Sequence, residues 1–151
     1  MKHLLFVFFF CIFLTAPAQA TSPCVQQTPE QFADVKAASD LIAHVRITHY
    51  KAAAINPHRD DSWTKADVLH VYKGAPAETV KITGWASYHQ PLYTYDKGSE
   101  AVLLLKKDGN KWRLTDMNWK SCVPSVIGLP ADMDVEQREE FIRERLGEIV
   151  K

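Results

Sequence analysis

The chain has 151 residues, of which 18 are lysine or arginine and 18 are aspartate or glutamate, so its formal net charge is zero. Basic and acidic side chains are interspersed along the whole chain, which excludes the basic stripe that nucleic-acid or anionic-membrane binding needs. This length suits one domain that buries its own hydrophobic core.

The first twenty residues have the three parts of a secretory signal peptide. Lys2 gives a positive start, an apolar run follows from Leu4 to Leu14, and Ala18-Gln19-Ala20 supplies small residues before the cleavage site. The apolar run is shorter than the about 20 residues that cross a bilayer. We therefore expect cleavage after Ala20, a secreted or periplasmic location and a single mature domain over residues 21–151, with no membrane span.

Two cysteines remain once Cys11 is removed with the signal. In an oxidising compartment Cys24 and Cys122 have only one possible pairing, and the bridge would close a loop of about a hundred residues. In the loop-entropy model, such a bridge stabilises the folded chain by roughly 4–5 kcal/mol, because it restricts the unfolded chain. The alternatives, a redox pair or a metal site, lack a C-x-x-C spacing. No cysteine directly follows the cleavage site, so no lipid anchor is expected.

The mature chain should open with a helix and a strand. Thr28-Pro29-Glu30-Gln31 has the residues of a helix start, and the helix should run to about Ala38. From residue 41 to 48 the period changes to two, which is typical of a strand with one buried face. The inward side chains of this strand are expected to be Leu41, Ala43, Val45 and Ile47.

Four further strands follow from the same pattern. Inward and outward residues alternate from Trp63 to Tyr72, with one break in the pattern that a β-bulge near Leu69 and His70 would explain. Thr79 to Trp85 should point Val80 and Ile82 inward. Asp108-Gly109-Asn110 tolerates the positive φ of a tight turn, which predicts a hairpin. The strands of this hairpin are Glu100–Lys107 and Lys111–Asp116.

An amphipathic helix should close the chain from about Val135 to Ile149. Its inward stripe is Val135, Ile142, Leu146 and Ile149, and its charged residues, Glu136, Arg138, Glu139, Arg143 and Glu144, are interpreted as a solvated face. Glu139 and Arg143 have the i,i+4 spacing of a surface ion pair worth a few tenths of a kcal/mol.

Five short strands with a helix at each end predict a mainly β fold, a five-stranded OB-type barrel, because closure hides the sheet edges. An open sandwich is the alternative. No repeats or low-complexity tracts are present.

The order of four segments resembles the netrin-like OB fold of tissue inhibitors of metalloproteinases, netrin C-terminal modules and exported bacterial proteins of undefined role. These segments are ASDLIAHV (38–45), ADVLHVYKG (66–74), TVKI (79–82) and KGSEAVLLL (97–105). The resemblance covers about Cys24 to Cys122. The mature chain should begin with Thr21, so the N-terminal cysteine by which the inhibitors bind zinc is missing, and Ala86 and Ser87 stand where the family often has further cysteines.

The densest candidate site is an aromatic connection that follows the third strand. Five rings lie within eleven residues, and exposed rings stack on sugars, bases or partner side chains. The alternative is that these rings cap the open end of the barrel. The five residues are Trp85, Tyr88, His89, Tyr93 and Tyr95.

A second candidate is the group of His58, Asp60 and Asp61, whose side chains include metal-ligand types, although three such neighbours in a polar loop are usually solvated. His44, His49 and His70 lie on predicted strands without a partner at a catalytic spacing, and they are interpreted as structural. No cofactor is indicated.

The function expected from the sequence is therefore a non-catalytic binding module outside the cell or in its envelope, with the connection from Trp85 to Tyr95 as its contact surface. Two alternatives remain. The family resemblance implies an inhibitor of a secreted hydrolase or protease, and His58 with Asp60 or Asp61 would suit a small metal-dependent enzyme.

Overall fold

The computed structural model of the chain describes residues 29–51, 60–75, 77–85, 97–116 and 125–147. The predicted signal peptide and both cysteines of the predicted disulfide lie outside these ranges. The described elements, in chain order, are α1 (Pro29–Ala38), β1 (Leu41–Lys51), β2 (Trp63–Lys73), β3 (Thr79–Thr83), β4 (Glu100–Asp108), β5 (Lys111–Leu114), β6 (Val126–Gly128) and α2 (Val135–Leu146).

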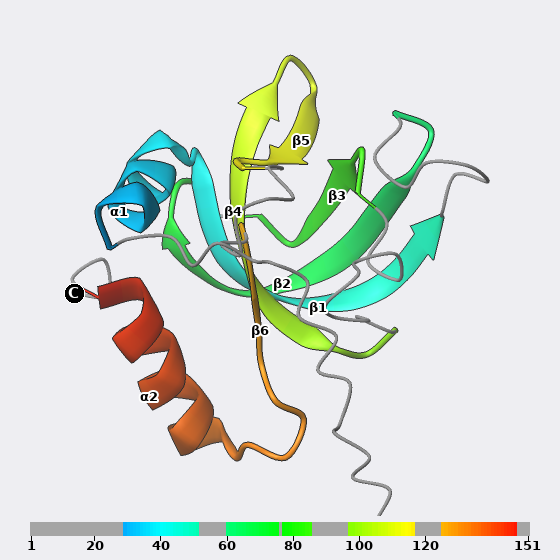
Figure 1. Cartoon of the computed structure of the whole chain (residues 1–151). Helices are drawn as coiled ribbons and strands as arrows, with labels where there is room; N and C mark the ends of the chain where they lie inside the picture. Colours follow the sequence, from blue (N-terminus) through cyan, green and yellow to red (C-terminus); the bar gives the residue numbers. More distant parts are fainter. Residues whose placement is uncertain (1–28, 52–59, 76, 86–96, 117–124, 148–151) are drawn as a thin grey trace, which may run out of the picture.

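Five of the strands form a closed barrel (Figure 1). The order is β1-β2-β3-β5-β4, and antiparallel pairing of β4 with β1 closes the circle. The contact between β3 and β5 is parallel, through Ile82 and Trp112, so the barrel is mixed. This confirms the predicted mainly β fold with one N-terminal and one C-terminal helix, and it is consistent with an OB-type barrel.

A sixth strand, β6, was not predicted. It pairs with Ala101–Leu103 of β4, whereas β5 pairs with Leu105–Asp108 of the same strand. β6 therefore covers the edge of β4 that β5 leaves open. Three residues are too few to show a hydrophobic period, which is why the sequence did not indicate this strand.

The barrel interior contains the side chains that alternation placed there. Leu41, Ala43, Val45 and Ile47 of β1 are all buried in one cluster with Val80 and Ile82 of β3. The expectation of a single buried face on β1 is wrong, however, because Ile42 on the opposite face is also fully buried. A second core covers this outer face, and it comprises Ile42, Val102, Leu104, Leu129, Ile142 and Leu146.

The predicted bulge in β2 is confirmed. The pairing of β1 with β2 passes from His44 opposite His70 to Val45 opposite Val68, so Leu69 is an extra residue without a partner on β1. Both Leu69 and His70 are exposed in consequence. Bulges commonly redirect side chains beside functional sites, and this one lies on the outer surface of the barrel.

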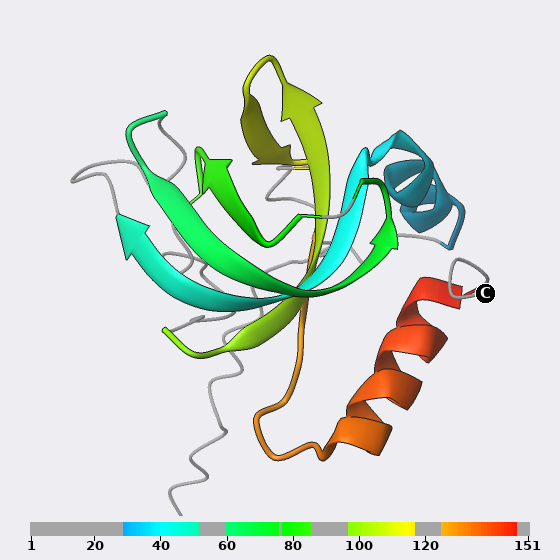
Figure 2. The same ribbon diagram turned by 180° about the vertical axis from the view of Figure 1, so that it is seen from behind.

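Helix α2 lies outside the barrel, as both views show (Figures 1 and 2). It begins with a capping box in which Asp134 and Gln137 bond each other's backbone N–H groups, and it ends at Leu146, before Gly147 with its φ of 63°. The predicted end at Ile149 is thus too late. Ile142 and Leu146 are buried as expected, but Val135 is 71% exposed, so the inward stripe is shorter than predicted.

Lysine side chains join the end of α1 to the barrel and the end of α2 to α1. Lys73 at the end of β2 donates to the carbonyl oxygens of Lys36 and Ala37, and Lys36 donates to that of Leu146. Cations are favourable at helix C-termini, where carbonyl groups lack partners within the helix. Neither of the described helices is long and apolar enough to cross a membrane.

Candidate functional site

The outer face of the barrel changes from apolar to charged along β1 and β4. On β1 this face carries Ile42, then His44 and Arg46, because alternate residues of a strand share a face. On the antiparallel β4 the sequence is Val102 and then Glu100. Since α2 covers Ile42 and Val102 with Ile142 and Leu146, the charged residues lie where the apolar cover of the helix ends.

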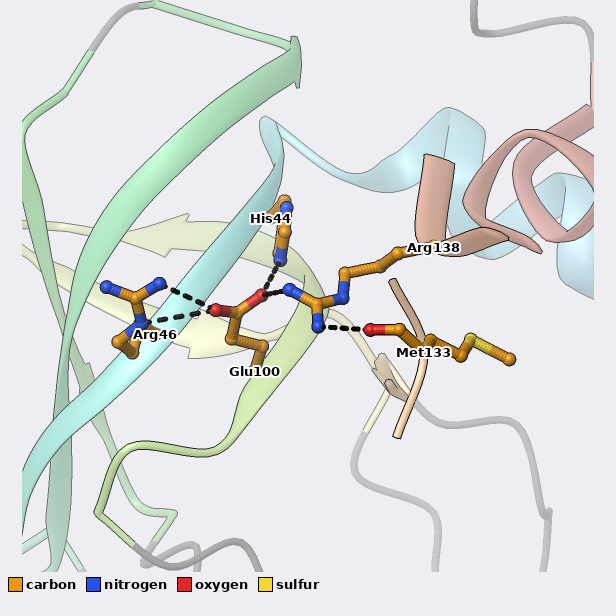
Figure 3. Close-up of polar contacts among 5 residues, drawn as sticks. All are labelled: His44, Arg46, Glu100, Met133 and Arg138. Atoms are coloured by element: carbon orange, nitrogen blue, oxygen red, sulfur yellow. Dashed lines mark hydrogen bonds and ion pairs between the residues drawn. The ribbon is translucent and has the colours of Figure 1, made fainter. Parts of the chain in front are cut away.

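Strand register brings three of these residues together. Glu100 lies directly opposite Arg46, and His44 is the next residue on the same face of β1. Arg138 reaches the same point from α2, one helical turn before Ile142. Figure 3 shows that the side chains of His44, Arg46 and Arg138 converge on the carboxylate of Glu100. We call His44, Arg46, Glu100 and Arg138 the Glu100 cluster.

The carboxylate of Glu100 accepts four hydrogen bonds. Its Oε1 accepts from Nη2 and Nε of Arg46, at 2.8 and 3.1 Å, and its Oε2 accepts from Nε2 of His44 at 2.8 Å and Nη1 of Arg138 at 2.7 Å. Arg138 also donates from Nη2 to the carbonyl of Met133 at 2.9 Å. The Glu100 side chain is only 12% exposed, so these charge-assisted bonds hold a nearly buried anion between the barrel and α2.

The protonation states in the Glu100 cluster follow from burial and charge. Burial lowers the pKa of His44, although the hydrogen bond and the charge of Glu100 act in the opposite direction. Burial acts to raise the pKa of Glu100, but the hydrogen bonds from Arg46 and His44 and the charge of Arg138 lower it overall. At neutral pH a neutral imidazole therefore donates its Nε2–H to an ionised carboxylate.

This arrangement predicts the pH dependence of stability. The pKa of His44 is lowered by folding, so the unfolded chain binds more protons as the pH falls below 6.5, and the free energy of unfolding should decrease there. Substitution His44→Gln should flatten the profile just below pH 6.5, measured by urea unfolding at several pH values. His49→Gln, at an exposed position on the same strand, is the control. An equal flattening in both variants would contradict this assignment.

A pocket of about 440 Å³ opens over the Glu100 cluster, between the outer face of the barrel and α2. Its volume is within the range of small-molecule sites. The barrel contributes His44, Arg46, Leu69, His70, Tyr72 and Glu100. Helix α2 contributes Val135, Arg138, Glu139, Ile142 and Arg143.

The β2 bulge and the helix start supply the apolar part of the pocket mouth. Leu69 is 42% exposed and Val135 is 71% exposed, and both line the pocket. Beside Leu69, the rings of His70 and Tyr72 lie 4.6 Å apart in a tilted arrangement. The pocket therefore combines a charged base with an apolar and aromatic rim.

The aromatic connection expected to bind ligands is described only at its first residue. Trp85 is fully buried and belongs to the core inside the barrel, so its ring is not available for stacking on a ligand. Its burial matches the alternative, in which these rings close the barrel. The remaining four residues, Tyr88, His89, Tyr93 and Tyr95, lie outside the described ranges.

The second predicted group is described in part. His58 lies outside the described residues, whereas Asp60 and Asp61 are exposed. Asp60 accepts a hydrogen bond from Arg113 at 2.8 Å, which lowers its pKa, and Lys111 lies 3.7 Å away. Its carboxylate thus already has cationic partners. Among the residues that the structure describes, no three acidic, histidine or cysteine side chains are grouped as metal ligands.

Sequence reasoning missed the Glu100 cluster. It assigned Arg138 to the solvated face of α2, which is wrong, because this side chain is 22% exposed and pairs with Glu100. His44 was interpreted as a histidine without a partner at a recognisable spacing, yet its partner lies 56 residues away. The alternation of β1 already placed His44 and Arg46 on one face; the missing information was the pairing of β1 with β4.

The predicted surface pair of Glu139 and Arg143 is not formed. Within the described part of the chain, no ion pair or hydrogen bond involves the guanidinium of Arg143, which is exposed at the pocket. The i,i+4 spacing permits such a pair without requiring it, since exposed pairs contribute little.

In comparisons with known proteins, no family model, no curated protein and no solved structure matches the chain.

Proposed function

We propose that this chain is a non-catalytic binding module, secreted or periplasmic, that holds a small ligand in the pocket between the barrel and α2. One observation carries the proposal: a pocket of about 440 Å³ is built on a cluster of charged side chains from three separate elements, β1, β4 and α2. Side chains held by such a network keep their positions before a ligand arrives, which reduces the entropy cost of binding.

The hydrogen bonds of Glu100 favour binding over acid–base chemistry. A carboxylate has about four acceptor positions, and protein donors occupy four at Glu100. The group is therefore committed to positioning its neighbours. Its neighbour His44 has its Nε2–H directed at this carboxylate (Figure 3).

The signal peptide, the Cys24–Cys122 bridge and the netrin-like assignment belong to this proposal as predictions from the sequence. Inhibition of a secreted protease is the alternative that the family resemblance implies. Assays of the purified chain against metalloproteases and serine proteases test this alternative directly, and inhibition at stoichiometric concentrations would favour it over a small-ligand pocket.

A thermal-shift screen with a blocked variant tests the proposal. A library of small acids, bases, neutral lipids and sugars is added to the wild-type chain, and a ligand at a hundred times its Kd should add about 2.7 kcal/mol of stability. Val135→Trp places a large ring at the exposed pocket mouth and should abolish the shift of every true ligand.

The matched control is Glu140→Trp, which adds the same ring to an exposed position of α2 outside the pocket lining. This variant should retain the full shifts. If ligands stabilise the wild type and Val135→Trp equally, the binding site lies elsewhere and the proposal is wrong.

A further inference from the structure

The charges that line the pocket are unequal. Among its described lining residues, three arginines, Arg46, Arg138 and Arg143, stand against two carboxylates, Glu100 and Glu139. Both histidines are counted as neutral. The excess of one positive charge favours an anionic ligand over a neutral or cationic one.

The charge of Arg143 is also accessible. Arg46 and Arg138 are both bonded to Glu100, whose single negative charge compensates one of them, and Glu139 is the other carboxylate of the lining. Arg143 is exposed, lines the pocket, and has no ionic partner within the described part of the chain. Its guanidinium presents a planar set of donors that matches a carboxylate or a phosphate group.

The apolar rim indicates the rest of the ligand. Only three large hydrophobic side chains are exposed among the described residues, and two of them, Leu69 and Val135, lie at this pocket. The bulge in β2 leaves the consecutive residues Leu69 and His70 both exposed, whereas a regular strand would have turned one of them inward. An aliphatic group placed between Leu69 and Val135 would cover both side chains and gain about 25 cal/mol for each Å² of apolar surface removed from water.

From these observations we infer that the pocket binds an aliphatic anion, whose carboxylate or phosphate group pairs with Arg143 while its chain packs between Leu69 and Val135. This inference rests on the proposed function and specifies its ligand class. It requires no change in the Glu100 cluster, because Arg143 lies outside that cluster.

Calorimetric titration of the full chain with five probes tests the inference. Octanoate and octyl phosphate carry both the anion and the chain, octylamine and octanol change the head group, and acetate lacks the chain. Octanoate or octyl phosphate should bind at least tenfold more tightly than the other three. The comparison of these two anions shows which oxyanion the pocket prefers, and a preference for either one supports the inference.

A charge-matched pair of variants locates the head group. Arg143→Gln should weaken binding of the preferred anion at least tenfold, since it removes the free guanidinium from an exposed position. Arg145→Gln removes the same charge from the same helix, at an exposed residue that lies over the Phe141 ring and outside the pocket lining. This control should change affinity less than twofold.

Three results would overturn the inference: tighter binding of octylamine or octanol, equal binding of acetate and octanoate, or equal losses in Arg143→Gln and Arg145→Gln. Octylamine or octanol binding that Val135→Trp abolishes would leave the proposed function intact while refuting the anionic ligand. Failure of every ligand in the screen would instead refute the proposed function.

Discussion

Substitution Gly74→Ala should destabilise the chain by about 3–4 kcal/mol, the largest effect expected here. Gly74 follows β2 with a φ of 98°, and a Cβ added to it would lie 2.3 Å from the carbonyl oxygen of Asp40. The positive φ costs roughly 1–2 kcal/mol for a residue with a Cβ, and the collision adds a further cost of about 2 kcal/mol because it involves backbone. Urea unfolding of both proteins measures the loss.

Gly98 provides the matched control. Its φ of 95° is nearly the same, but nothing lies within 4 Å of the corresponding Cβ. Gly98→Ala should therefore lower the free energy of unfolding only by the strain of its positive φ, about 1–2 kcal/mol. Equal losses at Gly74 and Gly98 would show that the close approach of β2 to the start of β1 has no energetic effect.

Glu100→Gln should destabilise the chain by about 2–3 kcal/mol. The glutamine amide lacks the negative charge with which both Arg138 and Arg46 pair. It leaves the guanidinium of Arg138, which is 22% exposed, without its anion. Breaking a fully buried ion pair costs about 3–5 kcal/mol, and the partial exposure of Arg138 reduces that figure. The loss is measured by urea unfolding at pH 7, where Glu100 is ionised.

The control for this substitution is Asp60→Asn, which removes a carboxylate from an ion pair with Arg113 at the surface. Asp60 is 62% exposed, so water replaces the lost contact and stability should be almost unchanged. If Glu100→Gln also has almost no effect, the Glu100 cluster does not hold α2 against the barrel.

The fold was predictable from the sequence wherever local patterns determine it. Two-residue alternation located β1 and β3, the turn chemistry of Asp108-Gly109-Asn110 located the hairpin, and the slip near Leu69 indicated the bulge. The errors arose where packing between distant segments determines which residues are buried. Ile42 looks like an outward residue of a half-exposed strand, and only contact with α2 explains its burial.

The candidate site was not predictable for the same physical reason. Its central residue, Glu100, begins a strand and carries no motif, and its partners lie 56, 54 and 38 residues away. The aromatic connection was the predicted site because its rings are close together in the sequence. Proximity along the chain is a poor guide when a barrel closes, because closure brings the first and fourth strands together.

The charged and apolar features of the pocket arise from the same two elements. The bulge in β2 exposes Leu69 and His70, and the orientation of α2 exposes Val135 while directing Arg138 to Glu100. A change that loosens α2 should therefore weaken both stability and ligand binding. This coupling links the fold to the proposed function without requiring any movement of the barrel.

Methyl NMR of the full chain, titrated with the ligand that stabilises it most in the thermal-shift screen, tests the central claim most directly. If the pocket is the binding site, the methyl signals of Leu69, Val135 and Ile142 should shift and saturate together, while those of Val80 and Leu103 inside the barrel stay unchanged. Shifts confined to other surfaces, with the three pocket residues unaffected, would contradict the account.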